Sequence, residues 1–311
     1  ATSMILRSGI VCVGAKLSAA QILALGWTTV PAAACSVGAG VTVIPWLARR
    51  FGLPPRLGAL LACGTSICGV TAISAVAPAI AATQAEVAIA VANVVAFGSL
   101  GMLIYPHVAH ILFPKADSQS IGLFLGLAVH DTAQVMGCAA SYAEQYADAA
   151  VIGAAAVAKL TRNVALAAVV PLMAVRHAGG GSAGAMSAKT FAAAVPVFVG
   201  GFLAMAAVRT VGDAQVASGR RALFAFDAPT WKGAADWVGA VLGTKILLGT
   251  GLAGVGLSVN FSAFSGAGIA PFVVGAAGAT IVGGVGLSVA LLISSVKSRG
   301  GAGEVGAVAS S

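Results

Sequence analysis

The sequence has few charged residues. Only 8% of its 311 residues are Asp, Glu, Lys or Arg, whereas 59% are hydrophobic. Soluble domains carry about 25% charged residues, and a soluble fold of this size could not bury so much apolar surface. The shortage of charge therefore excludes a soluble globular protein. It predicts an all-α, polytopic transmembrane protein, because the apolar runs are long enough to cross a bilayer as helices.

Cysteine is also scarce and irregularly placed. The five cysteines are scattered through apolar stretches, and no two form a C-x-x-C pair. An odd, scattered set argues against a disulfide framework or a zinc site. The chain also lacks a zinc motif, a nucleotide-binding loop and a nucleophile–base pair with recognisable spacing. We therefore expect no enzyme activity, no cofactor and no metal site.

Acidic residues are outnumbered by basic ones, nine to 17, which gives a formal net charge of +8. Many basic residues lie at the ends of apolar runs, as Arg49, Arg50, Arg220 and Arg221 do. This pattern is typical of membrane topology. Without interleaved stacking aromatics it excludes a nucleic-acid partner. We expect a multi-pass protein of the plasma membrane, with an organelle membrane as the alternative.

The apolar runs predict a single transmembrane domain over residues 1–311. A partial helix at 4–16 precedes eight full spans, at 23–47, 57–85, 87–113, 118–142, 149–175, 190–208, 234–259 and 266–296. Residues 212–232 are expected to form a surface loop or interfacial helix, and residues 297–311 a disordered tail. Because the chain opens inside an apolar run and without Met, we expect further helices to precede it in the full-length protein. The pattern leaves open whether the protein forms a homo-oligomer.

Two cations interrupt one of these runs. Lys159 and Arg162 lie near the middle of residues 149–175, where each costs about 2.5–3.5 kcal/mol at the bilayer midplane. Their i, i+3 spacing puts both on one helical face. They must meet counter-charges, water or an anionic substrate. One interpretation is a structural ion pair between helices. The other is a substrate or coupling-ion site, as intramembrane charges usually indicate.

A small polar segment from Gly64 to Gly69 interrupts the run at 57–85, with Thr65 and Ser66 between the two glycines. Such a segment can unwind a transmembrane helix and expose backbone groups to a ligand. It can equally serve close helix packing. We predict an interruption here, with the backbone amides near Thr65 and Ser66 at the N-terminal end of a broken helix.

His130 and Asp131 lie in the middle of another apolar run, followed by Gln134. Adjacent residues on a regular helix point about 100° apart, so a local break is predicted to bring both to one site. Asp131 is expected to balance Lys159 or Arg162. Histidine titrates near neutral pH, which suits proton coupling. The alternative for His130 is a hydrogen-bonded packing residue.

Two further lysines are weaker candidates for the same site. Lys245 lies well inside the run at 234–259, and Lys16 either faces the site or extends to the membrane interface. With His130 neutral, the central residues carry a net positive charge, which favours an anion. The arginine fork matches carboxylate, sulfate, sulfonate or phosphate oxygens.

Several motifs resemble those of one family of bacterial membrane proteins, the YeiH-type family, whose members are named sulfate exporters. The segment CGTSICG at 63–69 is similar to that family's Gly-Ser-Ser-Ile-Cys-Gly, and HDTAQV at 130–135 resembles its His-Glu-Val-Ala-Gln-Val. Weaker likenesses are KLTR at 159–162, Phe97-Gly98 with LIYP at 103–106, residues 7–17, and Gly256-Leu257-Ser258. Asp131 stands where the family usually has Glu, which keeps the charge on a shorter side chain.

This resemblance implies kinship with the superfamily of cation–proton antiporters and anion transporters. The implied fold has inverted repeats and discontinuous helices that cross at mid-membrane. Family members also carry further helices before the point where this chain starts.

We therefore predict a secondary transporter that exports a small oxyanion such as sulfate or an organosulfonate. The predicted substrate-binding residues are Lys159, Arg162, Gly64, Thr65, Ser66 and Gly69. The predicted coupling or gating residues are His130, Asp131 and Gln134. One alternative is a cation–proton antiporter with Asp131 as ion ligand. Another is a membrane scaffold subunit that does not transport.

Overall fold

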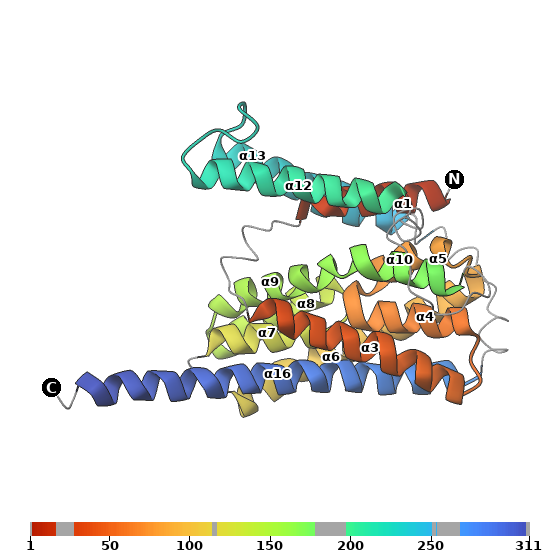
Figure 1. Ribbon diagram of the computed structural model, residues 1–311, viewed down its shortest axis with the longest axis horizontal. Coiled ribbons are helices and arrows are strands. Elements are labelled where there is room, and N and C mark those ends of the chain that lie inside the picture. The colour runs from red at the N-terminus through yellow and green to blue at the C-terminus, as the bar shows by residue number, and fades with distance from the viewer. Residues whose placement is uncertain are drawn as a thin grey trace.

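The computed structural model describes residues 2–16, 28–113, 117–177, 197–250, 253 and 268–308. All regular elements within these ranges are helices (Figure 1). Four described helical segments are long and apolar enough to cross a membrane: Thr29–Arg50, Gln84–Leu112, Ala150–His177 and Ala270–Lys297. The predicted all-α, polytopic architecture is confirmed.

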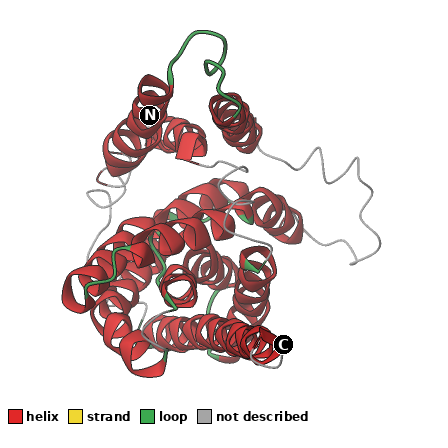
Figure 2. Cartoon of the chain, turned by 90° about the vertical axis from the view of Figure 1, so that its left-hand side faces the viewer, coloured by secondary structure: helices red, strands yellow, loops and turns green. Residues whose placement is uncertain are grey.

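The helices form two groups. One contains α1 (Thr2–Val13), the short helix η1 (Gly14–Lys16), α12 (Val197–Ala217), α13 (Ala228–Asp236) and the π-helix η3 (Trp237–Leu248), which contact one another. The other is a larger bundle around three long helical segments, α3 (Thr29–Arg50), α6 (Gln84–Leu112) and α16 (Ala270–Val308). Figure 2 shows the smaller group beside the bundle, and α1 contacts the bundle at α5 (Val70–Ala79).

The first interrupted segment is a hairpin that enters the bundle and returns to the same end. Helix α4 (Pro55–Cys63) begins beside the end of α3, where Gly58 packs on Ala48, and its π-helical extension η2 (Gly64–Cys68) ends the inward arm. Gly69, with φ +64°, reverses the chain into α5. Helix α5 packs against α4 and η2 and returns toward the end of the bundle where α4 began. Only a short loop then leads to α6.

The second interrupted segment is a hairpin from the opposite end. Helix α7 (Ser118–Ala128) runs inward alongside α9 (Ala150–Val164), with Gly126 packed on Ala155 and Ala158. The chain is extended at Val129 and at Asp131 before α8 (Thr132–Tyr146) begins. Along α8, Gln134 bonds to Ser99 and Tyr146 to His107. Helix α8 therefore follows α6 back to the end where α7 began.

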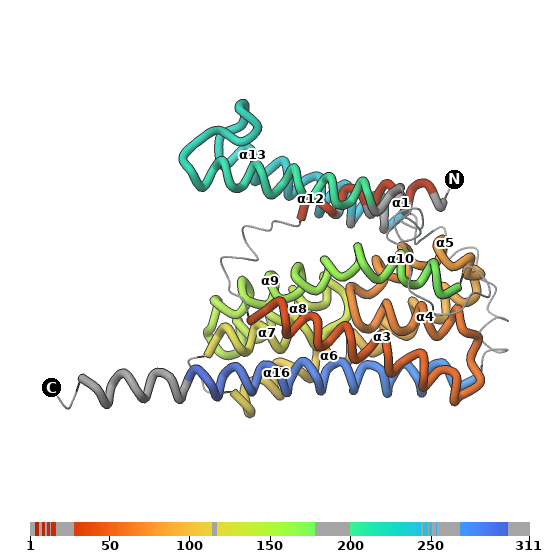
Figure 3. The backbone as a smooth tube through the Cα atoms, in the orientation of Figure 1, coloured from red at the N-terminus to blue at the C-terminus, as the bar shows by residue number. Residues whose placement is uncertain are grey.

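The two interruptions lie where the sequence predicts them, but each segment folds back instead of continuing across. In Figure 3, α4 and α5 lie toward one end of the bundle and α7 and α8 toward the other. Neither 57–85 nor 118–142 is therefore the single full span that the sequence predicted. Hydropathy indicates the length of an apolar run, but it does not show whether the chain reverses direction within that run. Helix α16 also continues through Val308, where disorder was expected from Lys297 onward.

Candidate functional site

The tips of the two hairpins meet in the middle of the bundle. Gly69 lies against Asp131 so closely that a Cβ atom on the glycine would be 2.9 Å from Asp131 Oδ2 and 3.0 Å from its Cα. The positive φ of Gly69 is also strained for any residue with a side chain. Glycine is therefore required at position 69 for two reasons. It allows the chain to reverse, and it allows the two tips to come into contact.

Lys159 and Arg162 bind both tips at once. Both side chains are fully buried. Lys159 Nζ donates to the carbonyl oxygens of Ile67 at 3.0 Å, of Val129 at 3.1 Å and of His130. Helix α9 contacts η2 of the first hairpin and both arms of the second, so Lys159 joins the first hairpin to the second.

The arginine repeats this pattern with more donors. Arg162 Nε donates to the Ile67 carbonyl at 2.7 Å, and Nη2 donates to the Val129 carbonyl at 2.9 Å. Its Nη1 donates to the Leu127 carbonyl. These carbonyls lie at the C-terminal ends of the two inward arms, where a helix carries about half a negative elementary charge. The two cations therefore satisfy and neutralise both ends.

The expected charge balance holds only as an electrostatic attraction between Asp131 and Lys159, without a direct ion pair. Among the described residues, neither Lys159 nor Arg162 forms an ion pair with Asp131. The Asp131 carboxylate caps α8, accepting a hydrogen bond from the Ala133 amide at 2.9 Å. Backbone carbonyl groups at two helix ends, and not the carboxylate, accept the hydrogen bonds of both cations. These acceptors become available because the helices end there, which the identity of the residues does not show.

The positions of Thr65 and Ser66 also correct an expectation. Both are buried in η2, which is the C-terminal end of the inward arm. The N-terminal helix end at this interruption begins at Val70. Backbone amides are therefore presented by the residues after Gly69, and the segment before it presents the Ile67 carbonyl.

A small cavity of about 30 Å³, lined by both polar and apolar side chains, lies beside the tips, between the bundle and the smaller group of helices. Its lining includes Lys16, Thr71, Asp131, Thr132 and Asn163. Thr71 and Thr132 belong to the first turns of the two outward arms, α5 and α8. The Asn163 side chain is 8% exposed. Among the described residues, its Oδ1 atom has no hydrogen-bond partner.

The structure keeps two of the predicted coupling residues, Asp131 and Gln134, together in the capping box of α8, and it buries His130 apart from the cavity. Asp131 lines the cavity, whereas His130 is buried at 2% exposure behind it, where its ring hydrogen-bonds to the Thr65 backbone. Within the described part of the chain, His130 Nδ1 has no partner. Gln134 does not line the cavity. Its Oε1 atom accepts a hydrogen bond from the Asp131 amide at 3.3 Å, and its amide nitrogen donates to the Val95 carbonyl at 3.2 Å and to Ser99 Oγ at 3.1 Å.

The two weaker candidates have different surroundings. Lys16 lines the cavity, and its aliphatic stem packs against Gly239 of η3. Lys245 is exposed. The tertiary structure therefore brings Lys16, and not Lys245, to the hairpin tips.

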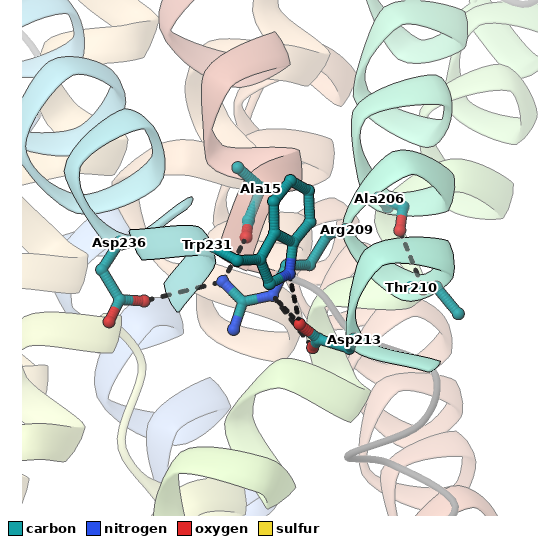
Figure 4. A network of polar contacts seen from close by, with 7 residues as sticks. All are labelled: Ala15, Ala206, Arg209, Thr210, Asp213, Trp231 and Asp236. Atoms are coloured by element: carbon teal, nitrogen blue, oxygen red, sulfur yellow. Dashed lines mark hydrogen bonds and ion pairs between the residues drawn. The ribbon is translucent and has the colours of Figure 1, made fainter. Parts of the chain in front are cut away.

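A buried arginine holds the backbone next to Lys16. Figure 4 shows Arg209 of α12 directed at Asp213, Asp236 and the Ala15 carbonyl. Arg209 Nε lies 2.9 Å from Asp213 Oδ1, which also accepts from Trp231 Nε1 at 2.8 Å. This network was not predicted from the sequence, although the i, i+4 spacing of Arg209 and Asp213 is a recognisable helical pair.

The sequence analysis also missed Thr71, Thr132 and Asn163. The two threonines follow the predicted interruptions directly, so attention to the residues after each break would have found them. Asn163 stands beside Arg162 but carries no charge, and nothing in its sequence surroundings singles it out.

Comparison with known proteins shows the family of the chain. The family described as "Conserved hypothetical protein 698" matches residues 1–275, and the chain belongs to it. A "UPF0324 membrane protein" of Listeria monocytogenes serotype 4b is 30% identical over 93% of this chain and 78% of its own length. Proteins of the same description from Geobacter sulfurreducens (34% identical over 68% of this chain and 62% of their length) and Bacillus anthracis (31% over 93% and 76%) are also similar. No solved structure matches.

These relatives are bacterial membrane proteins, and the chain is an integral, multi-pass membrane protein as predicted. Their descriptions state no substrate. The motif Gly256-Leu257-Ser258 of the sequence resemblance lies outside the described residues.

Proposed function

We propose that this protein is a secondary transporter that moves a small oxyanion, such as sulfate or an organosulfonate, through the cavity beside the hairpin tips. The observation that carries the proposal is the asymmetry of the tips. Buried Lys159 and Arg162 neutralise the C-terminal ends of the inward arms. The N-terminal ends of the outward arms, α5 and α8, border the cavity.

The chemistry of the cavity suits an oxyanion. Helix N-terminal ends favour anions, because their dipoles are positive and their first amide groups lack partners within the helix. The α5 end has no N-cap side chain, whereas the Asp131 carboxylate already caps the α8 end. Lys16 adds a cation, and Thr71 and Thr132 add hydroxyl donors. Lys159 and Arg162 contribute positive charge from behind the tips, since carbonyl groups already engage their donors. In this proposal they keep the hairpins in place and attract the substrate without contacting it.

Asp131 gives the proposal a coupling mechanism. An ionised carboxylate in the cavity repels an oxyanion, so binding of the anion favours the protonated form of Asp131. Linkage requires the reverse as well, so a proton on Asp131 strengthens anion binding by the same factor. Proton and anion would therefore move together.

The test is flux of radiolabelled sulfate or taurine in proteoliposomes. We expect Lys16→Gln to reduce flux at least about tenfold, the equivalent of roughly 1.4 kcal/mol. Lys232→Gln is the matched control, because it removes the same charge from an exposed position on α13. An unchanged flux in Lys16→Gln would refute the proposed substrate site.

The cation–proton antiporter remains the second candidate, and the position of Asp131 in the cavity favours it. In that case Asp131 is the ion ligand and Lys16 competes with the cation. Proteoliposomes loaded with a pH-sensitive dye distinguish the two, since the antiporter responds to added cation and the proposed transporter to added sulfate. A scaffold subunit would show neither response and would co-purify in a fixed complex.

A further inference from the structure

A second pocket lies at the base of the first hairpin, at the end of the bundle away from the tips. Its volume is about 380 Å³. It is enclosed by the last turns of α3 and of α10 (Leu166–His177) and by the first turns of α4. These three helix ends lie at the same end of the bundle in Figure 1. The pocket is therefore separate from the proposed transport cavity.

The rim of this pocket is cationic. Arg49 and Arg176 line it, and His177 stands next to Arg176. Both arginines are exposed. Among the described residues, neither has a carboxylate within ion-pair distance. His177 uses Nδ1 to bond the Met173 carbonyl at 2.9 Å, which leaves its other ring nitrogen directed elsewhere. Two guanidinium groups on one rim, without a carboxylate partner among the described residues, suit phosphate oxygens.

The wall of the pocket is apolar, which decides between a free anion and a lipid. Pro45, Leu53 and Met173 line it beside the arginines. Trp46, half exposed on the last turns of α3, has the Arg50 guanidinium 5.8 Å from its ring centroid. Exposed tryptophan and clustered arginine at the end of a spanning helix are typical of the level of the lipid headgroups. An occupant with a phosphate and an apolar body fits both halves of the pocket.

We propose that this pocket binds the phosphate headgroup of an anionic phospholipid, of the phosphatidylglycerol class. The phosphate lies between Arg49 and Arg176, and the glycerol and upper acyl segments lie against Leu53 and Met173. Basic pockets between transmembrane helices are known to select such headgroups. The bound lipid would fix the corner between α3 and α4, from which the first hairpin enters the bundle.

The experiment compares the full chain with a double variant, Arg49→Gln/Arg176→Gln. Each basic residue near a membrane surface contributes about 1 kcal/mol to anionic-lipid binding, so we expect about 30-fold weaker binding of phosphatidylglycerol. Native mass spectrometry of lipid titrations measures the affinity, and the shift in melting temperature on adding lipid provides a second readout. Phosphatidylcholine should bind with equal, low affinity to both proteins.

The matched control is Arg220→Gln/Arg221→Gln, which removes the same two charges from exposed positions between α12 and α13. It should retain the wild-type response to phosphatidylglycerol. An equal loss in the control, or an unchanged response in the pocket variant, would overturn the proposal. If millimolar inorganic phosphate or glycerol 3-phosphate reproduced the full shift, the pocket would be a free-anion site and the lipid assignment would be wrong. Should the double variant fail to fold, the single variants Arg49→Gln and Arg176→Gln must each lose part of the response.

Discussion

The two hairpins reach the same point by different means. The first reverses through one glycine, Gly69, after a π-helical end, and its tip offers mainly backbone groups. The second reverses through an extended segment and closes with a capping box formed by Asp131 and Gln134. Each hairpin also has its own buried apolar cluster. The first tip therefore depends on backbone geometry, whereas the second depends on polar side chains, and α9 joins them.

The largest expected effect comes from removing the hydrogen bonds by which Arg162 connects the two hairpins. Arg162→Ala removes the side-chain donor of the buried Leu127 carbonyl and leaves the Ile67 and Val129 carbonyls with Lys159 alone, so we expect a loss of roughly 3–5 kcal/mol of stability together with transport. Arg162→Lys should recover only part, because it lacks the fork of donors. Thermal unfolding in detergent measures the loss. Thr161→Ala is the control, since Thr161 bonds within its own helix.

A second substitution tells which contact matters in the arginine variant. Because Arg162 binds carbonyls and not Asp131, adding Asp131→Asn to Arg162→Ala should restore nothing. Recovery of the melting temperature in the double variant would show that the aspartate is the true partner.

An intermediate effect is expected at the first tip. Gly69→Ala places a Cβ atom against Asp131 at a backbone conformation reserved for glycine, so we expect about 1–3 kcal/mol of destabilisation. Gly52→Ala is the matched control: its φ is +68°, but nothing lies within 4 Å of the added Cβ. The difference in melting temperature between the two variants isolates the contact between the tips. Equal losses would mean that only backbone strain matters.

The smallest expected effect is at the second tip. Asp131→Ala removes the cap of α8, which typically costs about 1 kcal/mol, while Asp131→Asn keeps a good capping residue and loses the charge. We therefore expect Asp131→Asn to fold normally but to lose the proton dependence of sulfate flux, measured across a pH gradient. Thr83→Ala, which removes the comparable cap of α6, should lower stability without changing that dependence. A normal pH dependence in Asp131→Asn would separate Asp131 from coupling.

The sequence predicted the interruptions well, because small and polar residues inside an apolar run leave few alternatives. Lys159, Arg162 and Asp131 stood out for the same reason, since charge inside a membrane is costly. Their partners could not be predicted. The acceptors for both cations are backbone carbonyls, which every residue possesses and which become available only where a helix ends. Lys16 reaches the cavity through the packing of η1 and η3, although its position in the sequence is remote from the hairpins.

Composition and the apolar runs are enough to indicate a helical, multi-pass membrane protein with charged residues and two breaks inside those runs. The apolar composition indicates the helical membrane protein, because a helix satisfies its own backbone hydrogen bonds in lipid. The charged and small polar residues indicate the site and the breaks, because such residues are costly inside an apolar run. Only the tertiary structure decided that both broken segments fold back and meet at Gly69 and Asp131. The direction of a chain after a break depends on which neighbouring helices it packs against, and no local pattern encodes that.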